Sequence, residues 1–142
     1  MSEWIETFRG VVYPWHCDHL GHMNVQHYVG MFDQASFHLL AALGIDLEDG
    51  RSGGEFLVDV QHTVQYKAEQ RAGSLVRIES AVTKIGTTSL TLVHRMFNCR
   101  TGVLAATSEV VEVYFDLTTR SSLPIPDTLR TIVEPHLVTV TS

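Results

Sequence analysis

The sequence predicts an α+β fold: an antiparallel sheet of about five strands wrapped around one long central helix. Two patterns carry this prediction. A long stretch near the N-terminus has apolar residues at helical spacing, and several runs of strand character then follow one another with turn residues between them. Consecutive strands joined by short turns pair antiparallel. The length of 142 residues suits a single domain over 1–142.

The first predicted elements are a short strand and the long helix. Residues 8–14 (FRGVVYP) indicate a strand that ends at Pro14, and residues 15–24 (WHCDHLGHMN) form an irregular segment. The helix is predicted from about Asn24, a good N-cap, to Leu43, where Gly44 can stop it. Its apolar stripe comprises Val25, Tyr28, Val29, Phe32, Ala35, Leu39, Leu40 and Leu43.

After the Gly-rich stretch EDGRSGGE the apolar period changes to two. Residues 56–66 predict a long strand, and the alternating set that starts at Phe56 and includes Val58 and Val60 is expected to be its buried face. Further strands are predicted at 75–85, 89–98 and 104–116, with turns at Gly73, Gly86 and Arg100-Thr101-Gly102. The tail PDTLRTIVE indicates a short closing helix that starts near Asp127 or Thr128.

Composition excludes several classes of protein. The formal net charge is −6 and there is no run of lysine and arginine, so neither nucleic acid nor an anionic membrane is an expected partner. No apolar run is long enough to span a bilayer, and the N-terminus lacks the apolar core of a signal peptide. Cys17 and Cys99 are expected to be reduced thiols in a cytoplasmic protein.

The segment around residues 13–36 resembles the 4-hydroxybenzoyl-CoA thioesterase group of hotdog-fold proteins. The pattern of that group is an aspartate, two residues, Gly-His-hydrophobic-Asn and then an aromatic residue within a helix. The matching positions are Asp18, Gly21, His22, Met23, Asn24 and Tyr28. TVQYKAEQRAGSLVRIES and CRTGVLAATSEVVEVYFDLTTRSSLPIP resemble the later strands and tail of the group, so the resemblance covers nearly the whole chain.

The resemblance implies a hotdog-fold acyl-CoA thioesterase that needs no cofactor, with Asp18 as its catalytic residue. It also implies a homodimer or a tetramer built as a dimer of dimers, with active sites that draw on both protomers. Two positions depart from the pattern. His16 stands where many members have a second aspartate, and Val25 stands where one bacterial branch has a histidine. The acyl group therefore cannot be carried over from the family.

Thioester hydrolysis needs an attacking oxygen and stabilisation of the charge that develops on the carbonyl. The Asp18 carboxylate could attack directly or activate a water molecule. The N–H groups of Asn24 and Val25 at the start of the helix could polarise the thioester oxygen. The structural alternative is that Asp18 caps its own turn. His22 could orient Asp18 or bind the substrate, or it could simply hold the loop backbone.

Other candidate residues have plainer interpretations. Asn24 suits a helix cap, Tyr28 suits the core, and His62 and His94 suit buried or half-buried positions with hydrogen-bond partners. His16, Cys17, His19 and His22 are all possible metal ligands, but their spacing fits one tetrahedral ion poorly, so no metal is expected. Lys84, Arg95 and Arg100 are candidate partners of the CoA phosphates and are equally well explained as surface charges.

Two rival functions remain open at this stage. A hotdog hydratase or dehydratase would need a histidine and a carboxylate placed for proton transfer, for which Asp18 and His22 are a weak match. A non-catalytic acyl-binding protein would use the same fold without chemistry.

Overall fold

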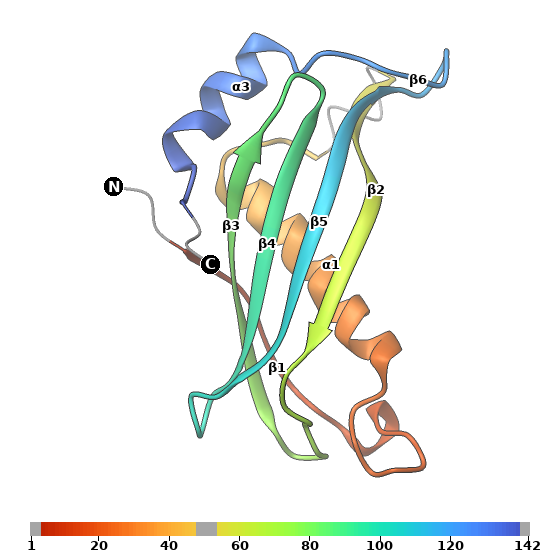
Figure 1. The fold of residues 1–142 in the computed structure, drawn as a ribbon, viewed down its shortest axis with the longest axis vertical. Coiled ribbons are helices and arrows are strands. Elements are labelled where there is room, and N and C mark those ends of the chain that lie inside the picture. Colours follow the sequence, from red (N-terminus) through yellow and green to blue (C-terminus); the bar gives the residue numbers. More distant parts are fainter. Residues whose placement is uncertain (1–3, 48–53, 140–142) are drawn as a thin grey trace.

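The protein is described from a computed structural model that covers residues 4–47 and 54–139. Most of the Gly-rich stretch EDGRSGGE lies outside the described residues. The described chain forms one antiparallel sheet in the order β1-β3-β4-β5-β2, with a short β6 paired to β5, and helices beside it (Figure 1). The strands are β1 (Ile5–Val11), β2 (Glu55–Tyr66), β3 (Leu75–Ile85), β4 (Ser89–Asn98), β5 (Leu104–Asp116) and β6 (Ser121–Ser122).

The long helix α1 (Val25–Ala42) lies across one face of the sheet and packs against β1, β3 and β4 (Figure 1). Asn24 is its N-cap, as predicted, because the Asn24 Oδ1 accepts a hydrogen bond of 3.1 Å from the Gln26 N–H. Leu43 closes the other end, and Gly44 follows with a φ of 94°, a conformation that favours glycine. The helix therefore fixes where the 15–24 segment is presented.

The buried face of α1 is rotated slightly from the predicted stripe. Val25 and Val29 are 54% and 37% exposed, so their inclusion in the stripe was wrong, whereas Met31 and Ser36 are buried. The apolar core forms two clusters along the helix. Phe32 lies in the cluster near its N-terminal half, and Leu39 lies in the cluster near its C-terminal half. The exposed side chains of Val25 and Val29 show that the first two turns of α1 are not covered by the rest of the described chain, so a ligand can reach them.

The first strand begins and ends three residues earlier than predicted. It covers Ile5–Val11, and Pro14 instead begins a short 3-10 turn, η1 (Pro14–His16). Proline fixes φ near −65° and has no N–H, which suits the first position of such a turn better than a strand. The strands predicted at 75–85, 89–98 and 104–116 match β3, β4 and β5.

The buried face predicted for β2 holds only in part, because the strand contains a β-bulge: Leu57 is buried before the bulge, whereas Val64 of the predicted face packs against the core after it. Asp59 pairs with Glu112 and Gln61 pairs with Val111, so Val60 is an extra residue on β2 and is 59% exposed. A one-residue shift moves side chains to the opposite face of the sheet. Only Leu57 of this strand is buried, and β2 is otherwise a largely exposed edge.

A second, short helix lies near the C-terminal end of the chain, so the prediction of a sheet with one long helix holds only in part. The helix α3 (Asp127–Val133) begins at Asp127, as predicted, and continues into a 3-10 turn, η2 (Glu134–His136). Its Val133 is fully buried in the cluster that contains Leu39. No helix within residues 4–47 and 54–139 is long and apolar enough to cross a membrane.

Candidate active site

Asp18 lies in a small hairpin that leads into α1. The Asp18 N–H donates to the His22 carbonyl over 3.0 Å, and the Gly21 N–H donates to the Asp18 carbonyl over 3.0 Å. Gly21 has a φ of 81°, which glycine adopts without strain. The hairpin is tied to the rest of the molecule by a bond of 2.8 Å from the Met23 N–H to the Gln70 carbonyl. The glycine of the motif thus shapes the turn that presents Asp18.

The Asp18 carboxylate is held ionised by its surroundings. Its Oδ1 accepts a hydrogen bond of 2.9 Å from the Leu20 N–H, and this bond is the main cause that lowers the pKa of Asp18. Burial opposes it as the second-largest influence, and weaker effects of the Asn24 side-chain hydrogen bond, the His22 backbone and His19 lower the pKa as well. Asp18 therefore caps its own turn, and it also lies beside the helix cap Asn24.

The N–H groups at the start of α1 differ in their partners. The Asn24 N–H donates to the His16 carbonyl over 2.8 Å, so it is not free to polarise the thioester oxygen as predicted. Asn24 accepts from the Gln26 N–H through its side chain and from the His27 N–H, over 3.0 Å, through its carbonyl. No acceptor for the Val25 N–H is found among the described residues. An unpaired first amide with the partial positive charge of the helix N-terminus can stabilise a developing oxyanion. The carboxylate and this donor are brought together by Asn24.

A cavity of about 410 Å³ opens beside the first turns of α1. One wall is formed by Met23 of the motif and by Val25 and Tyr28 of α1. The other wall is formed by Tyr66 at the end of β2 and by Lys67 and Glu69 in the loop after it. Tyr28 is buried, as predicted, and meets Tyr66 edge to face with ring centroids 5.1 Å apart. The lining combines the apolar residues Met23 and Val25 with the charged residues Lys67 and Glu69, a combination compatible with an acyl group joined to a polar carrier.

His22 lines the same cavity, but its ring contacts Glu69 and not Asp18. Its Nε2 lies 3.1 Å from Glu69 Oε2, whereas only its backbone bonds Asp18. The structure thus gives His22 a position at the wall of the cavity and pairs its imidazole with Glu69. A role for His22 in substrate binding is compatible with this position.

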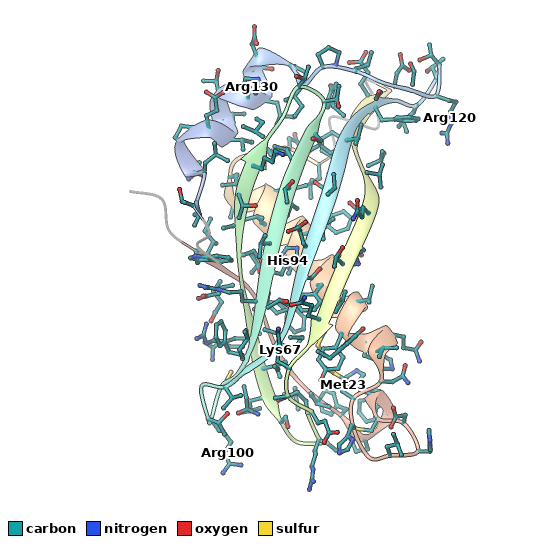
Figure 2. The ribbon with its side chains drawn as sticks, viewed as in Figure 1. Met23, Lys67, His94, Arg100, Arg120 and Arg130 are labelled. Atoms are coloured by element: carbon teal, nitrogen blue, oxygen red, sulfur yellow. The ribbon has the colours of Figure 1, made fainter. Side chains whose placement is uncertain are left out.

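The cations near the cavity differ from those predicted to bind phosphate. Lys67 lines the cavity, and Arg71 is bridged to His22 through the backbone. Figure 2 shows Lys67 and Met23 toward the end of the molecule where α1 begins. Arg95 is instead held in a structural contact, ion-paired to Glu79 and stacked 3.6 Å above the Trp4 ring. Lys67 directly follows the strand 56–66 in sequence, and that position is the signal that sequence reasoning missed.

The histidine-rich segment does not gather into a metal site. His16 Nδ1 accepts a 2.9 Å bond from the Tyr13 N–H, and its ring lies 4.8 Å from that of His27. Across the part of the chain that the structure describes, no group of three metal-ligating side chains is found. His16 and His22 therefore serve separate local contacts.

His94 is fully buried beneath α1, as predicted for a histidine with hydrogen-bond partners. Its Nε2 bonds Ser36 Oγ at 2.8 Å, its Nδ1 bonds Ser80 Oγ at 2.5 Å, and its ring stacks on Phe32. Burial lowers the pKa of His94 to about 3, with a smaller effect from His62, so the ring is neutral. Figure 2 shows His94 at the centre of the sheet, away from the Asp18 loop.

The comparison with protein families decides the family. Residues 12–133 match the family described as the thioesterase-like superfamily, which covers the motif, α1 and all the long strands after it. The chain belongs to this superfamily. The resemblance drawn from the Asp18 motif is thereby confirmed at the level of the family, and the hotdog fold is confirmed with it. No curated protein sequence matches the chain.

Solved structures similar to this superfamily member have the same fold. One is a hypothetical protein of Staphylococcus aureus in complex with CoA, with a TM-score of 0.88 and 19% identity over 100% of this chain and 90% of that chain. Another is a 1,4-dihydroxy-2-naphthoyl-CoA thioesterase of Synechocystis, with a TM-score of 0.81 and 17% identity over 92% of this chain and 96% of that chain. Each of the two alignments thus covers at least 90% of both chains.

Proposed function

We propose that the protein is an acyl-CoA thioesterase that hydrolyses its substrate to a free acid and CoA. The observation that supports this most directly is the juxtaposition at the start of α1. The ionised Asp18 lies beside Asn24, and the Val25 N–H has no acceptor among the described residues. Membership of the thioesterase-like superfamily and the CoA bound in a similar structure agree with it.

In the proposed reaction the thioester carbonyl lies near the Val25 N–H and its carbon faces Asp18. In the nucleophilic route the carboxylate attacks that carbon, the C–S bond breaks, and CoA leaves as a thiolate that takes up a proton. Water then cleaves the mixed anhydride to the free acid and restores Asp18. In the general-base route Asp18 takes a proton from water as the water attacks the same carbon, the C–S bond breaks, and the CoA thiolate takes up the proton from Asp18.

Both routes require Asp18 in its ionised form. The lowered pKa of Asp18 keeps it ionised at neutral pH and is compatible with either route. A single turnover in ¹⁸O-labelled water with excess enzyme tests the nucleophilic route. Label found in the Asp18 side chain supports attack by the carboxylate, because the general-base route never places solvent oxygen there; label found only in the released acid fits the general base and also an anhydride that water opens at its acyl carbon.

The proposal also covers the residues that contact the substrate and the oligomeric state. His22, Asn24 and Val25 contact the substrate, and Lys67 and Arg71 lie where CoA phosphates could be bound. We also propose a homodimer or a dimer of dimers and a cytoplasmic location, with no cofactor.

The experiment that tests the proposed activity is a panel of acyl-CoAs assayed with a thiol reagent. Release of free CoA that depends on the enzyme supports the thioesterase. Loss of a double bond without CoA release would instead indicate a hydratase, and binding without either change would indicate a non-catalytic acyl-binding protein.

A further inference from the structure

A second cavity, of about 430 Å³, lies between α1 and the N-terminal half of β2. Three carboxyl groups line it, and they come from three different elements: Asp33 on α1, Asp59 on β2 and Glu112 on β5. No lysine, arginine or histidine is among the described residues that line it. Its remaining walls are mainly apolar and include the rings of Phe37 and Phe56.

Glu112 is the group that makes this cavity unusual. It lies directly opposite Asp59 across the β5–β2 pair, next to the bulge at Val60. It is only 5% exposed, and its Oε1 has no hydrogen-bond partner within the described residues. A buried polar atom without a partner costs free energy, so a site that keeps one is suited to a ligand that supplies the missing donor.

The surroundings of Glu112 also hold a proton at the site. The pKa of Glu112 is raised to about 9, mainly by burial and also by the hydrogen bond and negative charge of Asp59 and the negative charge of Asp33. Glu112 is therefore protonated in the empty cavity at neutral pH. A positive charge placed beside it would stabilise the carboxylate, and the proton would leave.

We propose that this cavity binds an ammonium group that donates a hydrogen bond to Glu112 and is surrounded by Asp59 and Asp33. A neutral hydroxyl could also donate to Oε1, but it would leave the clustered negative charge uncompensated. A cation offsets that charge, and the faces of Phe37 and Phe56 are compatible with it because aromatic rings attract cations.

The ligand that carries this group is inferred to be the acyl part of the substrate, and this step rests on the proposed thioesterase activity. Asp33 follows Val25 by eight residues on α1, which places it about 12 Å further along the helix axis. Both cavities lie between α1 and β2. The substrate class is thus a CoA thioester of an amino acid-like or amine-bearing acid.

The binding test uses probes without CoA, so that it does not depend on catalysis. Butylammonium and 1-butanol are titrated into the full chain by calorimetry at pH 7.5, in two buffers of different ionisation enthalpy. We expect butylammonium to bind at least about 10-fold more tightly, a difference of about 1.4 kcal/mol, with release of a proton. Equal or tighter binding of 1-butanol, or no binding of either, would overturn the ammonium site.

Two matched variants test whether Glu112 is the group that releases the proton and binds butylammonium. Glu112→Gln should keep the fold, because glutamine resembles the protonated acid, but should abolish the proton release and weaken butylammonium binding. Glu109→Gln, an exposed glutamate on the same strand, should change neither. Melting temperatures of both variants show whether they are folded. Proton release that persists in folded Glu112→Gln would overturn the role of Glu112.

The substrate class is tested with 6-aminohexanoyl-CoA and its neutral counterpart heptanoyl-CoA. We expect kcat/KM at least about 10-fold higher for the amine, and loss of that preference in Glu112→Gln. Hydrolysis of both without preference would overturn the substrate class while leaving the thioesterase intact. Butylammonium binding without hydrolysis of any thioester would keep the cation site and contradict the proposed function.

Discussion

At the scale of single residues, two kinds of carboxylate and one histidine have environments that set their charge. Asp18 is stabilised in its ionised form by hydrogen bonds, Glu112 is stabilised in its neutral form by burial, and His94 is neutral for the same reason. Sequence reasoning identified Asp18 from its motif and assigned His94 correctly to a buried position. It missed Glu112, although a glutamate within the apolar run VVEVYF was a visible signal.

The titration of His94 predicts how stability responds to acid. Because the folded state holds a pKa of about 3 and an unfolded histidine titrates near 6.5, the unfolded state takes up a proton first. The free energy of unfolding should therefore fall as pH drops from about 6.5 toward 3, by up to about 1.4 kcal/mol per pH unit from this group.

His94→Gln isolates this effect, because glutamine can still bond Ser36 and Ser80 but does not titrate. We expect the variant to be less stable by about 1–2 kcal/mol at pH 7, as for an imperfect buried replacement. The difference from the natural chain should shrink between pH 6.5 and 4.5 in chemical unfolding. A difference that stays constant with pH would show that His94 is not the acid-sensitive group.

At the scale of elements, the sequence predicted the helix and the long strands from their periods but did not predict the β-bulges within the strands. The periods of the sequence and the turn residues predicted α1 and the three long strands β3, β4 and β5, although bulges at Thr83 and Ala105 within β3 and β5 were not foreseen. The bulge at Val60 reverses the faces of β2 within an unbroken alternating pattern, so the predicted buried face was wrong before the bulge and holds after it, at Val64. The same bulge borders Asp59, whose position opposite Glu112 depends on pairing between distant segments.

The start of α1 combines a cap with a positioning role, and Asn24→Ser separates the two. A serine hydroxyl can still accept from the Gln26 N–H, and serine caps helices about as well as asparagine, so stability should change little. It cannot reproduce the bond from the Asn24 side chain to Asp18. We expect turnover to fall and the acid limb of the pH–rate profile to move to higher pH, since that bond lowers the pKa of Asp18.

Asn24→Ala is the control for the cap itself. It should cost about 1 kcal/mol of stability in addition to the loss of turnover. Unchanged turnover and an unchanged pH profile in Asn24→Ser would mean that Asn24 acts only as a cap.

At the scale of the whole molecule, the strand β2 forms a long and mostly exposed edge of the sheet. It has 12 residues, only one of which is buried. A long exposed edge invites pairing with another chain, so the homo-oligomer remains a prediction that this edge supports. Light scattering at low micromolar concentration should give a particle of at least twice the 15.9 kDa of the chain. A particle of the mass of one chain would contradict it.

If Asp18 performs chemistry, its loss should differ from the loss of an aspartate that only caps a turn, and Asp116 is a matched control of that kind. Asp116 also caps its own turn, accepting from the Thr118 N–H at 2.8 Å, and its pKa is likewise lowered by such bonds. It ends β5, and the Asp18 loop lies at the opposite end of the molecule (Figure 1). Asp116→Asn should therefore cost some stability and leave turnover unchanged.

The decisive measurement is turnover and melting temperature of Asp18→Asn, with the best substrate of the acyl-CoA panel. Asparagine keeps the shape and the acceptor for the Leu20 N–H but removes the negative oxygen. We expect turnover to fall by at least about 10²-fold while substrate binding and the folded state persist. A folded Asp18→Asn variant with the turnover of the natural chain would contradict the catalytic assignment and leave Asp18 as a turn cap.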